Sequence, residues 1–141
     1  MIVKIKRLNP KAKLPSYAHE GDVAMDLYSI EHKTIVPGER YVFPCGFAME
    51  FPTGYAGIVK DKGSVSTKAG LHTIGGVFDA GYRGEYNVCL YNLSDKEYTI
   101  EEGDKIAQLL ILPVEIAKIE EVDSLSETSR GEGRFGSTGR K

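Results

Sequence analysis

The stretch R-G-E-G-R-F-G-S-T-G, Arg130 to Gly139, concentrates residue types that bind phosphate. Backbone N–H groups freed by glycine, hydroxyls and guanidinium groups suit an oligophosphate, and Phe135 adds a face on which a base can stack. Gly131, Gly133 and Gly136 spell GxGxxG, and the spacing from Gly131 to Ser137 is that of a P-loop with serine in place of lysine. Neither motif has the strand before it and the helix after it that its chemistry requires. The residues alone leave open a phosphate-binding segment and an unstructured tail.

The segment G-G-V-F-D-A-G-Y-R-G-E, Gly75 to Glu85, predicts a β-hairpin with Asp79 and Tyr82 at its bend. In one interpretation this is ordinary turn chemistry, in which Asp79 bonds its own backbone and Gly81 supplies a positive φ. In the other, the surplus of glycines lets a planar ligand approach the main chain. These glycines are Gly75, Gly76, Gly81 and Gly84.

Two further segments carry weaker signals. In K-D-K-G-S-V-S-T-K, cations lie beside hydroxyls, and a serine is expected to cap a single helical turn over Ser64 to Gly70, with Gly70 ending it. The first N–H groups of such a turn favour an anion. In G-D-K-I-A-Q-L-L-I, Gln108 is a polar residue within an otherwise apolar strand.

The elements that must position these residues are short strands. Turn signals such as Pro37-Gly38 and Glu102-Gly103-Asp104 separate strand-length runs at spacings of roughly ten residues, which favours a β-sandwich or barrel over alternating βαβ units. The predicted strands include Tyr41-Val42-Phe43, Tyr55 to Val59, Tyr86 to Tyr91 and Ile106 to Leu112. After Ser129 the chain is too poor in apolar residues to fold alone, so a mobile arm is expected there.

Composition limits the classes of protein to which the chain can belong. The chain has 141 residues, enough for one domain, and a net charge of -2 with a pI near 5.9 argues against a nucleic-acid partner. Cys45 and Cys89 form no CxxC motif, and the three histidines have no metal-ligand spacing. With no apolar run of membrane length and no signal-peptide pattern, we expect no membrane partner and a cytoplasmic location.

Five segments in one order resemble the trimeric dUTPases: A-M-D-L-Y-S, K-D-K-G-S, V-F-D-A-G-Y-R-G-E, G-D-K-I-A-Q-L and R-G-E-G-R-F-G-S-T-G. The resemblance covers nearly the whole chain. It implies an all-β, jelly-roll-like barrel or sandwich of the β-clip type, with domain residues 1–123 and a flexible C-terminal arm at 124–141. It also implies a homotrimer with active sites at subunit interfaces, each covered by an arm from another subunit.

The activity that this resemblance implies is hydrolysis of dUTP to dUMP and pyrophosphate, which limits uracil in DNA and supplies dUMP. Asp79 would activate the water that attacks the α-phosphorus, and Tyr82 would pack under the deoxyribose. Mg²⁺ would be held mainly by the triphosphate and through a water by Asp26. The main chain that reads uracil would be Gly76, Val77, Tyr86, Asn87 and Val88. Phosphate contacts would come from Lys62, Ser64 and Gln108 and from Arg130, Ser137 and Thr138 of the arm. Phe135 would stack on the uracil, and Gly63 and Gly136 would complete the substrate-binding set.

Two positions depart from the family pattern. Lys62-Gly63-Ser64 replaces the usual arginine-serine-glycine, and Arg134 replaces a glycine of the arm motif. Lysine lacks the bidentate fork of arginine, so looser phosphate binding is expected unless Ser64 compensates. Three alternatives stay open: a dCTP deaminase, a non-catalytic nucleotide-binding regulator and a purely structural β trimer.

Overall fold

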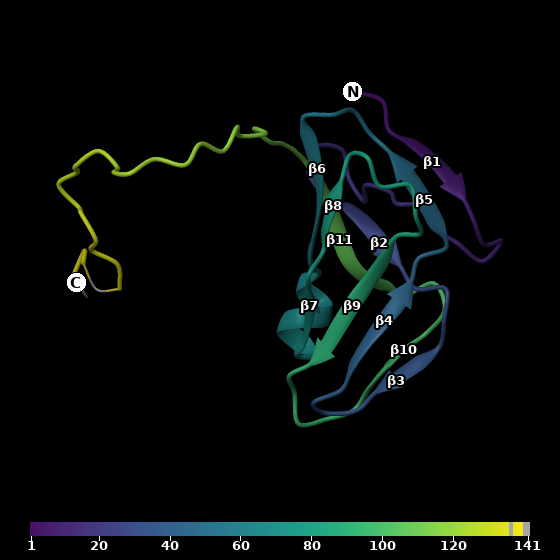
Figure 1. Cartoon of the computed structure of the whole chain (residues 1–141). Coiled ribbons are helices and arrows are strands. Elements are labelled where there is room, and N and C mark those ends of the chain that lie inside the picture. The colour runs from purple at the N-terminus through teal and green to yellow at the C-terminus, as the bar shows by residue number, and fades with distance from the viewer. Residues whose placement is uncertain (136, 140–141) are drawn as a thin grey trace.

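The protein is an all-β domain followed by an extended C-terminal segment (Figure 1). The computed structural model describes residues 1–135 and 137–139. The all-β expectation and the four predicted strands are confirmed. The strands are β1 (Lys4–Arg7), β2 (Met25–Tyr28), β3 (Lys33–Ile35), β4 (Arg40–Pro44), β5 (Phe47–Glu50), β6 (Tyr55–Asp61), β7 (Leu71–Ile74), β8 (Val77–Asp79), β9 (Asn87–Asn92), β10 (Tyr98–Ile100) and β11 (Lys105–Pro113).

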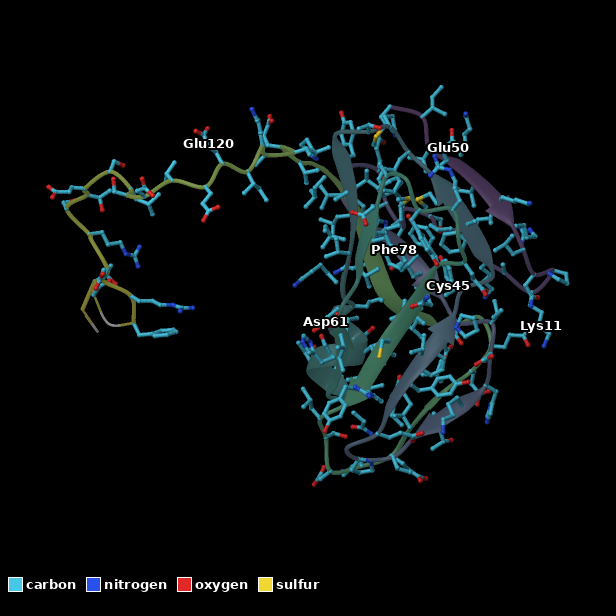
Figure 2. All side chains as sticks on the ribbon, viewed as in Figure 1. Lys11, Cys45, Glu50, Asp61, Phe78 and Glu120 are labelled. Atoms are coloured by element: carbon cyan, nitrogen blue, oxygen red, sulfur yellow. The ribbon has the colours of Figure 1, made fainter. Side chains whose placement is uncertain are left out.

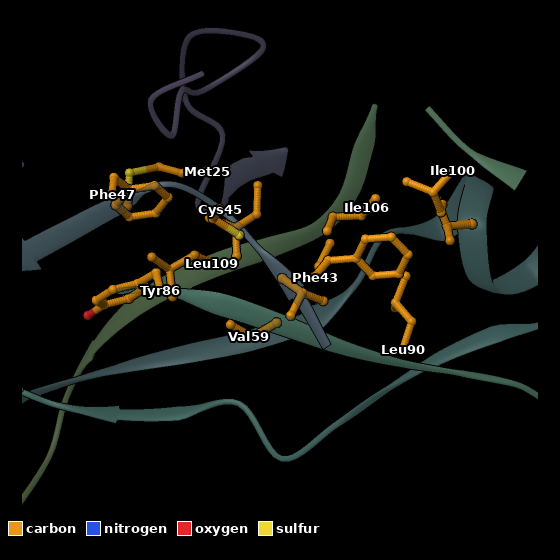
Figure 3. Close-up of a cluster of buried hydrophobic side chains, with 14 of the residues drawn as sticks. Met25, Phe43, Cys45, Phe47, Val59, Tyr86, Leu90, Ile100, Ile106 and Leu109 are labelled. Carbon is orange, nitrogen blue, oxygen red and sulfur yellow. The ribbon is translucent and has the colours of Figure 1, made fainter. Parts of the chain in front are cut away.

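Two sheets enclose the core. One has four strands in the order β2-β11-β6-β8 and the other has three in the order β4-β9-β7, while β1 pairs with β5 and β10 with β3. Side chains of both larger sheets meet in one apolar cluster, as Figure 3 shows for Val59 and Leu109 from one sheet and Phe43 and Leu90 from the other. Burying a side chain of this size contributes about 2 kcal/mol relative to exposure. The cluster therefore fixes the two sheets that carry the candidate site.

A β-bulge in β11 determines which way its polar residue faces. Both Ile106 and Ala107 are buried, and the register with β2 shifts between Lys105 and Ala107. Beyond this bulge, strict alternation resumes and Gln108 points away from the core, directly opposite Asp26 of β2. The bulge thus brings Asp26 and Gln108 to the same face of the sheet.

The predicted hairpin over Gly75 to Glu85 is wrong. β8 pairs with β6 in the four-stranded sheet, whereas β9 lies between β4 and β7 in the other sheet. The positive φ angles fall at Gly75 (71°) and Gly76 (95°), and Gly81 has none. At Gly76 a Cβ would also lie 2.8 Å from that of Val59, so this glycine is needed where the chain crosses from one sheet to the other.

The expected helical turn exists but is built differently. A π-helix, η1 (Ser64–Lys68), follows β6, and its N-cap is Gly63 with no side-chain capping hydrogen bond, so the predicted serine cap is wrong. The hydroxyl of Ser66 instead donates to the carbonyl oxygen of Lys62 at 3.2 Å. The prediction that Gly70 ends the turn is confirmed, because its N–H donates to the carbonyl oxygen of Ser66 and its φ is 73°.

Beyond β11 the chain leaves the domain. The last strand ends at Pro113, ten residues before the predicted boundary at 123, and the following segment runs away from the sheets (Figure 1). The division at 123 stays a prediction. No helix among the residues that the structure describes has the length and apolar character needed to cross a membrane.

Candidate active site

The first group of candidate residues lies at one end of the four-stranded sheet. Gln108 of β11 is opposite both Asp26 of β2 and Lys60 of β6, and Lys62 follows the end of β6. A cavity of about 190 Å³ is lined by Ala18, Asp22, Val23, Ala24, Asp26, Lys62 and Gln108. The structure therefore brings together three predicted residues, Asp26, Lys62 and Gln108, which lie far apart in the sequence.

Asp26 is a buried carboxylate held between two lysines. Only 4% of the residue is exposed, and the Nζ atoms of Lys62 and Lys105 lie 2.6 Å from Oδ1 and Oδ2, respectively. Burial raises the pKa of the Asp26 carboxyl, but the hydrogen bonds from Lys105 and Lys62 outweigh burial and lower it below its usual value. The same bond raises the pKa of Lys105. The Asp26 carboxylate is thus negatively charged, and the two lysine ammonium groups balance its charge.

Lys105 was not among the predicted site residues. It begins β11, before the bulge, and sequence alternation alone does not show which way its side chain points. A buried carboxylate needs charge compensation, but neither the burial of Asp26 nor its pairing with Lys105 can be read from the sequence.

Gly63 and Ser64 lie where β6 passes into η1, and both are exposed. Gln108 is oriented by its own amide, because Nε2 donates to the main-chain oxygen of Asp61 at 2.7 Å. An amide nitrogen carries two hydrogens, so a second donor remains for a ligand. Lys62 and Gln108 therefore place donors at the cavity, which suits an anion, whereas Ser64 lines a different pocket with Thr67 and Lys68.

The second group lies around the end of β8. Asp79 is exposed, and the structure gives its carboxylate no hydrogen bond or ion pair among the described residues. Its main-chain oxygen accepts a hydrogen bond from the N–H of Tyr82 at 3.0 Å, which closes a turn. The predicted residues Asp79 and Tyr82 are therefore adjacent, and the carboxylate is free of protein partners there.

Tyr82 is fixed by contacts within this turn. Its hydroxyl donates to the carbonyl oxygen of Glu85 at 3.0 Å, and its ring lies 5.7 Å from that of Phe78. A Cβ at Gly84 would collide with the ring of Tyr82. Gly84 thus makes room for the protein's own aromatic side chain, which keeps an exposed face.

β8 and β9 do not pair with each other, because each pairs with other strands, and the region between these two strands is called the slot below. The N–H of Val59 donates to the main-chain oxygen of Gly76. Because bonded and non-bonded pairs alternate along an antiparallel ladder, the next pair, Ile58 and Val77, is not hydrogen-bonded. The N–H and C=O of Val77 therefore face away from β6. On β9 the N–H and C=O of Tyr86 are both used, with Phe47 and Cys45. By alternation the main chain of Asn87 points the other way. The backbone groups of Val77 therefore lie on the unpaired edge of β8, those of Asn87 point away from β4, and those of Tyr86 are occupied.

Aromatic rings pack beside the slot. The ring of Tyr86 is fully buried and stacks between Phe78 at 4.1 Å and Phe47 at 5.2 Å between centroids. Burial raises the pKa of Tyr86 to about 12, and the nearby Tyr82 adds to this increase. Arg83 has a smaller effect in the opposite direction. This neutral stack holds Phe78, and with it β8, at a fixed position next to β9.

The two groups lie at opposite ends of the same sheet. Along β6, Asp79 is opposite Ala56, whereas Gln108 is opposite Lys60. Four residues of strand correspond to about 13 Å. Within one subunit the acid of the second group is therefore separated from the cationic cavity of the first.

The arm residues form a separate turn at the end of the extended segment. Nε of Arg130 donates to the oxygen of Gly133 at 2.9 Å, and the N–H of Ser137 donates to the oxygen of Arg134 at 3.1 Å. Phe135 is 91% exposed, with the Arg134 guanidinium 4.8 Å from its ring centroid. Ser137 and Thr138 are exposed, and Gly136 lies outside the described residues. The structure does not bring these residues to either group.

Comparison with known proteins gives one consistent result. The family profile described as dUTPase matches residues 10–139. The chain is 43% identical to the deoxyuridine 5'-triphosphate nucleotidohydrolase of Clostridium tetani, covering 98% of this chain and 97% of that protein. It is 44% identical to the protein of the same description from Alkaliphilus metalliredigens, covering 99% and 98%.

Solved structures agree in fold. The dUTPase of Staphylococcus bacteriophage 80alpha, solved with dUpNHpp, superposes with a TM-score of 0.92 at 29% identity over 98% of both chains. A mutant dUTPase from phage phi11 of S. aureus, described with a structural Mg(II) ion, gives a TM-score of 0.84 at 25% identity, covering 90% of this chain and 100% of that one. With a family match over most of its length and relatives above 40% identity, the chain belongs to the dUTPase family.

Proposed function

We propose that this protein hydrolyses dUTP to dUMP and pyrophosphate by attack of water at the α-phosphorus, with Asp79 as the residue that orients and deprotonates the water. The observation that carries this proposal is an exposed, unpaired Asp79 carboxylate at the end of β8, next to the slot between β8 and β9, in a chain of the dUTPase family. A general base must be within reach of its water and must hold no competing partner. Asp79 meets the second condition among the described residues.

Uracil binds in the slot and is read by main-chain groups. Val77 and Asn87 supply the donors and acceptors, while the main chain of Tyr86 is occupied by Phe47 and Cys45. Cytosine presents the opposite pattern at its edge, and such a mismatch leaves buried polar groups unpaired. The stacked rings of Phe78 and Tyr86 hold β8 in place beside β9.

Tyr82 lies under the deoxyribose. The hydrogen bond to Glu85 and the close contact with Gly84 hold its ring in place. A rigid ring that fits against the C2′ edge of the sugar leaves no room for a 2′-hydroxyl. This accounts for preference of dUTP over UTP by exclusion rather than by added contacts.

The phosphates bind at the other group, to Lys62, Ser64 and Gln108, with the main chain around Gly63 exposed at the start of η1. Asp26 does not act as a base here, because its charge is already matched by Lys62 and Lys105. Arg130, Ser137 and Thr138 of the arm hold the γ-phosphate, and Phe135 stacks on the uracil.

Mg²⁺ fits this arrangement as an ion carried by the triphosphate. Oδ1 of Asp26 accepts a hydrogen bond from Lys62 and Oδ2 lies 2.6 Å from Nζ of Lys105, and each oxygen keeps a lone pair with which to accept a hydrogen bond from a metal-bound water. The neighbouring ammonium groups disfavour direct binding of a second cation to this carboxylate. When bound, the metal would neutralise phosphate charge, and it keeps most of its waters.

The complete site requires more than one subunit. The Asp79 group and the Asp26 group lie about 13 Å apart along β6 in one chain. We infer a homotrimer of jelly-roll domains in which Asp79 of one subunit faces Lys62 and Gln108 of the next. The arm, which runs away from its own domain in Figure 1, covers a site on another subunit.

Product analysis tests the proposed reaction. Purified protein is incubated with dUTP, dCTP, dTTP and UTP, each with Mg²⁺ and with chelator. We expect pyrophosphate and dUMP from dUTP alone, with loss on chelation. Ammonia from dCTP would assign the deaminase reaction instead, and tight dUTP binding without turnover would identify a nucleotide-binding regulator.

A further inference from the structure

Asp61 lies at the end of β6 that carries the first group, beside Lys62 and Gln108, and the proposed function gives it no role. It is the last residue of β6 and directly precedes Lys62. Figure 2 labels it beside η1. Its side chain is 28% exposed, and three of its oxygen atoms take part in four hydrogen bonds.

The carboxylate joins β6 to β7. Oδ1 accepts from both the N–H and the hydroxyl of Thr73, each at 2.7 Å, and Oδ2 lies 2.7 Å from Nδ1 of His72. β6 and β7 belong to different sheets, so these bonds hold the chain in place at the point where it leaves the four-stranded sheet. Lys62 is the next residue, and its position follows from that of Asp61.

The main-chain oxygen of Asp61 holds a phosphate-binding side chain directly. It accepts the hydrogen bond from Nε2 of Gln108 at 2.7 Å, which uses one amide hydrogen and directs the other. A movement of the end of β6 would therefore shift Lys62 and Gln108 together. Donor placement within a few tenths of an ångström decides how well a charged group is bound.

An aspartate suits this position for a physical reason. Aspartate is disfavoured in strands, yet a short carboxylate offers about four lone-pair sites in one plane. Burial raises the pKa of the Asp61 carboxyl, but the hydrogen bonds from Thr73 and His72 outweigh burial and lower it, so the acceptor stays ionised. Its bonds to Thr73 are of the stronger, charge-assisted kind.

We propose that Asp61 is a positioning residue that sets Lys62 and Gln108 for the β- and γ-phosphates, through its side-chain bonds to Thr73 and its main-chain bond to Gln108. This inference rests on the proposed function. It predicts that loss of the Asp61 carboxylate weakens binding of the triphosphate and leaves binding of the monophosphate unchanged.

The test compares dissociation constants of the full-length protein for dUpNHpp with Mg²⁺ and for dUMP, measured by calorimetry. Asp61→Ala should weaken dUpNHpp about tenfold and dUMP less than twofold. Asp61→Asn, which keeps an acceptor for Thr73, should recover most of the loss. Thr73→Val should reproduce part of the effect and add little to Asp61→Ala, because both remove the same bonds.

Glu39→Ala is the matched control. Glu39 also pairs with a lysine, Lys33, and accepts from a backbone N–H, that of Val36, but in a turn remote from the cavity. We expect it to leave both dissociation constants unchanged. Equal weakening of dUpNHpp and dUMP by Asp61→Ala, or an effect no larger than that of Glu39→Ala, would overturn the inference. Wild-type protein that binds neither ligand would instead contradict the proposed function.

Discussion

Two aspartates of one sheet, Asp26 and Asp79, have opposite surroundings. Asp26 is 4% exposed and bonded to two ammonium groups at 2.6 Å. Asp79, at the other end of the sheet, is exposed and has no ion pair or hydrogen bond to its carboxylate among the described residues. The same side chain is therefore a structural anion in one place and an available proton acceptor in the other.

This contrast teaches that residue type alone does not identify a base. A carboxylate whose charge is matched by two lysines takes up a proton only at a cost, because the proton would leave those lysines without a partner. An exposed carboxylate beside a ligand slot has no such constraint. Environment, rather than the presence of an aspartate, thus distinguishes the two proposed roles.

The largest expected effect is that of Asp79→Asn. This change keeps the shape of the side chain and removes the proton acceptor, so kcat should fall by about three orders of magnitude. The dissociation constant for dUpNHpp should change less than threefold. Steady-state kinetics and calorimetry measure the two, with Asp95→Asn in the β9–β10 loop as control. Turnover at the wild-type rate would remove Asp79 as the base.

Asp26→Asn should affect both stability and binding. The change removes the charged partner of Lys62 and Lys105, whose side chains are 26% and 43% exposed, so the free energy of unfolding should fall. Misplaced Lys62 should also lower kcat/KM about thirtyfold through KM. Denaturant unfolding and kinetics check this. An effect on kcat alone, without loss of stability, would mean that Asp26 acts in the chemical step.

Phe135→Ala tests whether the arm serves the same site as Asp79. The side chain is 91% exposed and contributes nothing to the core. Loss of its stacking on the base should lower kcat/KM about tenfold, while the Tm without nucleotide stays unchanged. Phe135→Tyr, which keeps the ring, is the control. A large drop in Tm without nucleotide would contradict an arm ordered by substrate.

Acid titration should show that Asp26 contributes more than Asp79 to the pH dependence of the free energy of unfolding. The folded-state pKa of Asp26 lies below its ordinary value of 3.8, so the folded protein binds fewer protons there than the unfolded chain. Its contribution to stability is therefore present above pH 3.8 and lost as pH falls through the folded pKa. Between pH 6 and pH 2, roughly, unfolding free energy should decline less steeply in Asp26→Asn than in Asp79→Asn. Parallel curves would contradict the ion-pair assignment.

The smallest expected effect is that of Lys62→Arg. The guanidinium can keep the bond to Asp26 and add a bidentate contact to phosphate, so kcat/KM should stay within about threefold of the wild type or rise. Kinetics at saturating Mg²⁺ measure it. A collapse of kcat/KM would show that the cavity is shaped around the lysine ammonium.

Sequence reasoning found the strands because their signals are local, and the roles of the candidate site residues stay predictions. Alternation within β9 and β11, and turn residues such as Gly70, depend on neighbouring residues only. It failed at the segment Gly75 to Glu85, where pairing with β6 overrides the hairpin that the local pattern favours. Strand pairing is a long-range property that turn chemistry does not specify.

The partners of the charged residues could also not be predicted from the sequence. Lys105 pairs with Asp26, and Asp61 bonds to Thr73, and both partners lie far away in the chain. A bulge places Gln108 opposite Asp26, and its position cannot be read from alternation. The motifs supplied the candidate residues, and in the folded chain Asp26, Lys62 and Gln108 lie apart from Asp79 and Tyr82.

Mixing two inactive variants tests most directly whether these groups combine across subunits to form one site. Asp79→Asn and Lys62→Ala proteins are unfolded together in equal amounts, refolded and assayed for dUMP from dUTP. If Asp79 of one subunit faces Lys62 of another, random assembly restores both residues in about a quarter of the sites, and activity returns to about that fraction of the wild type. If each chain forms its own site, the mixture stays as inactive as its components, and the shared-site account is wrong.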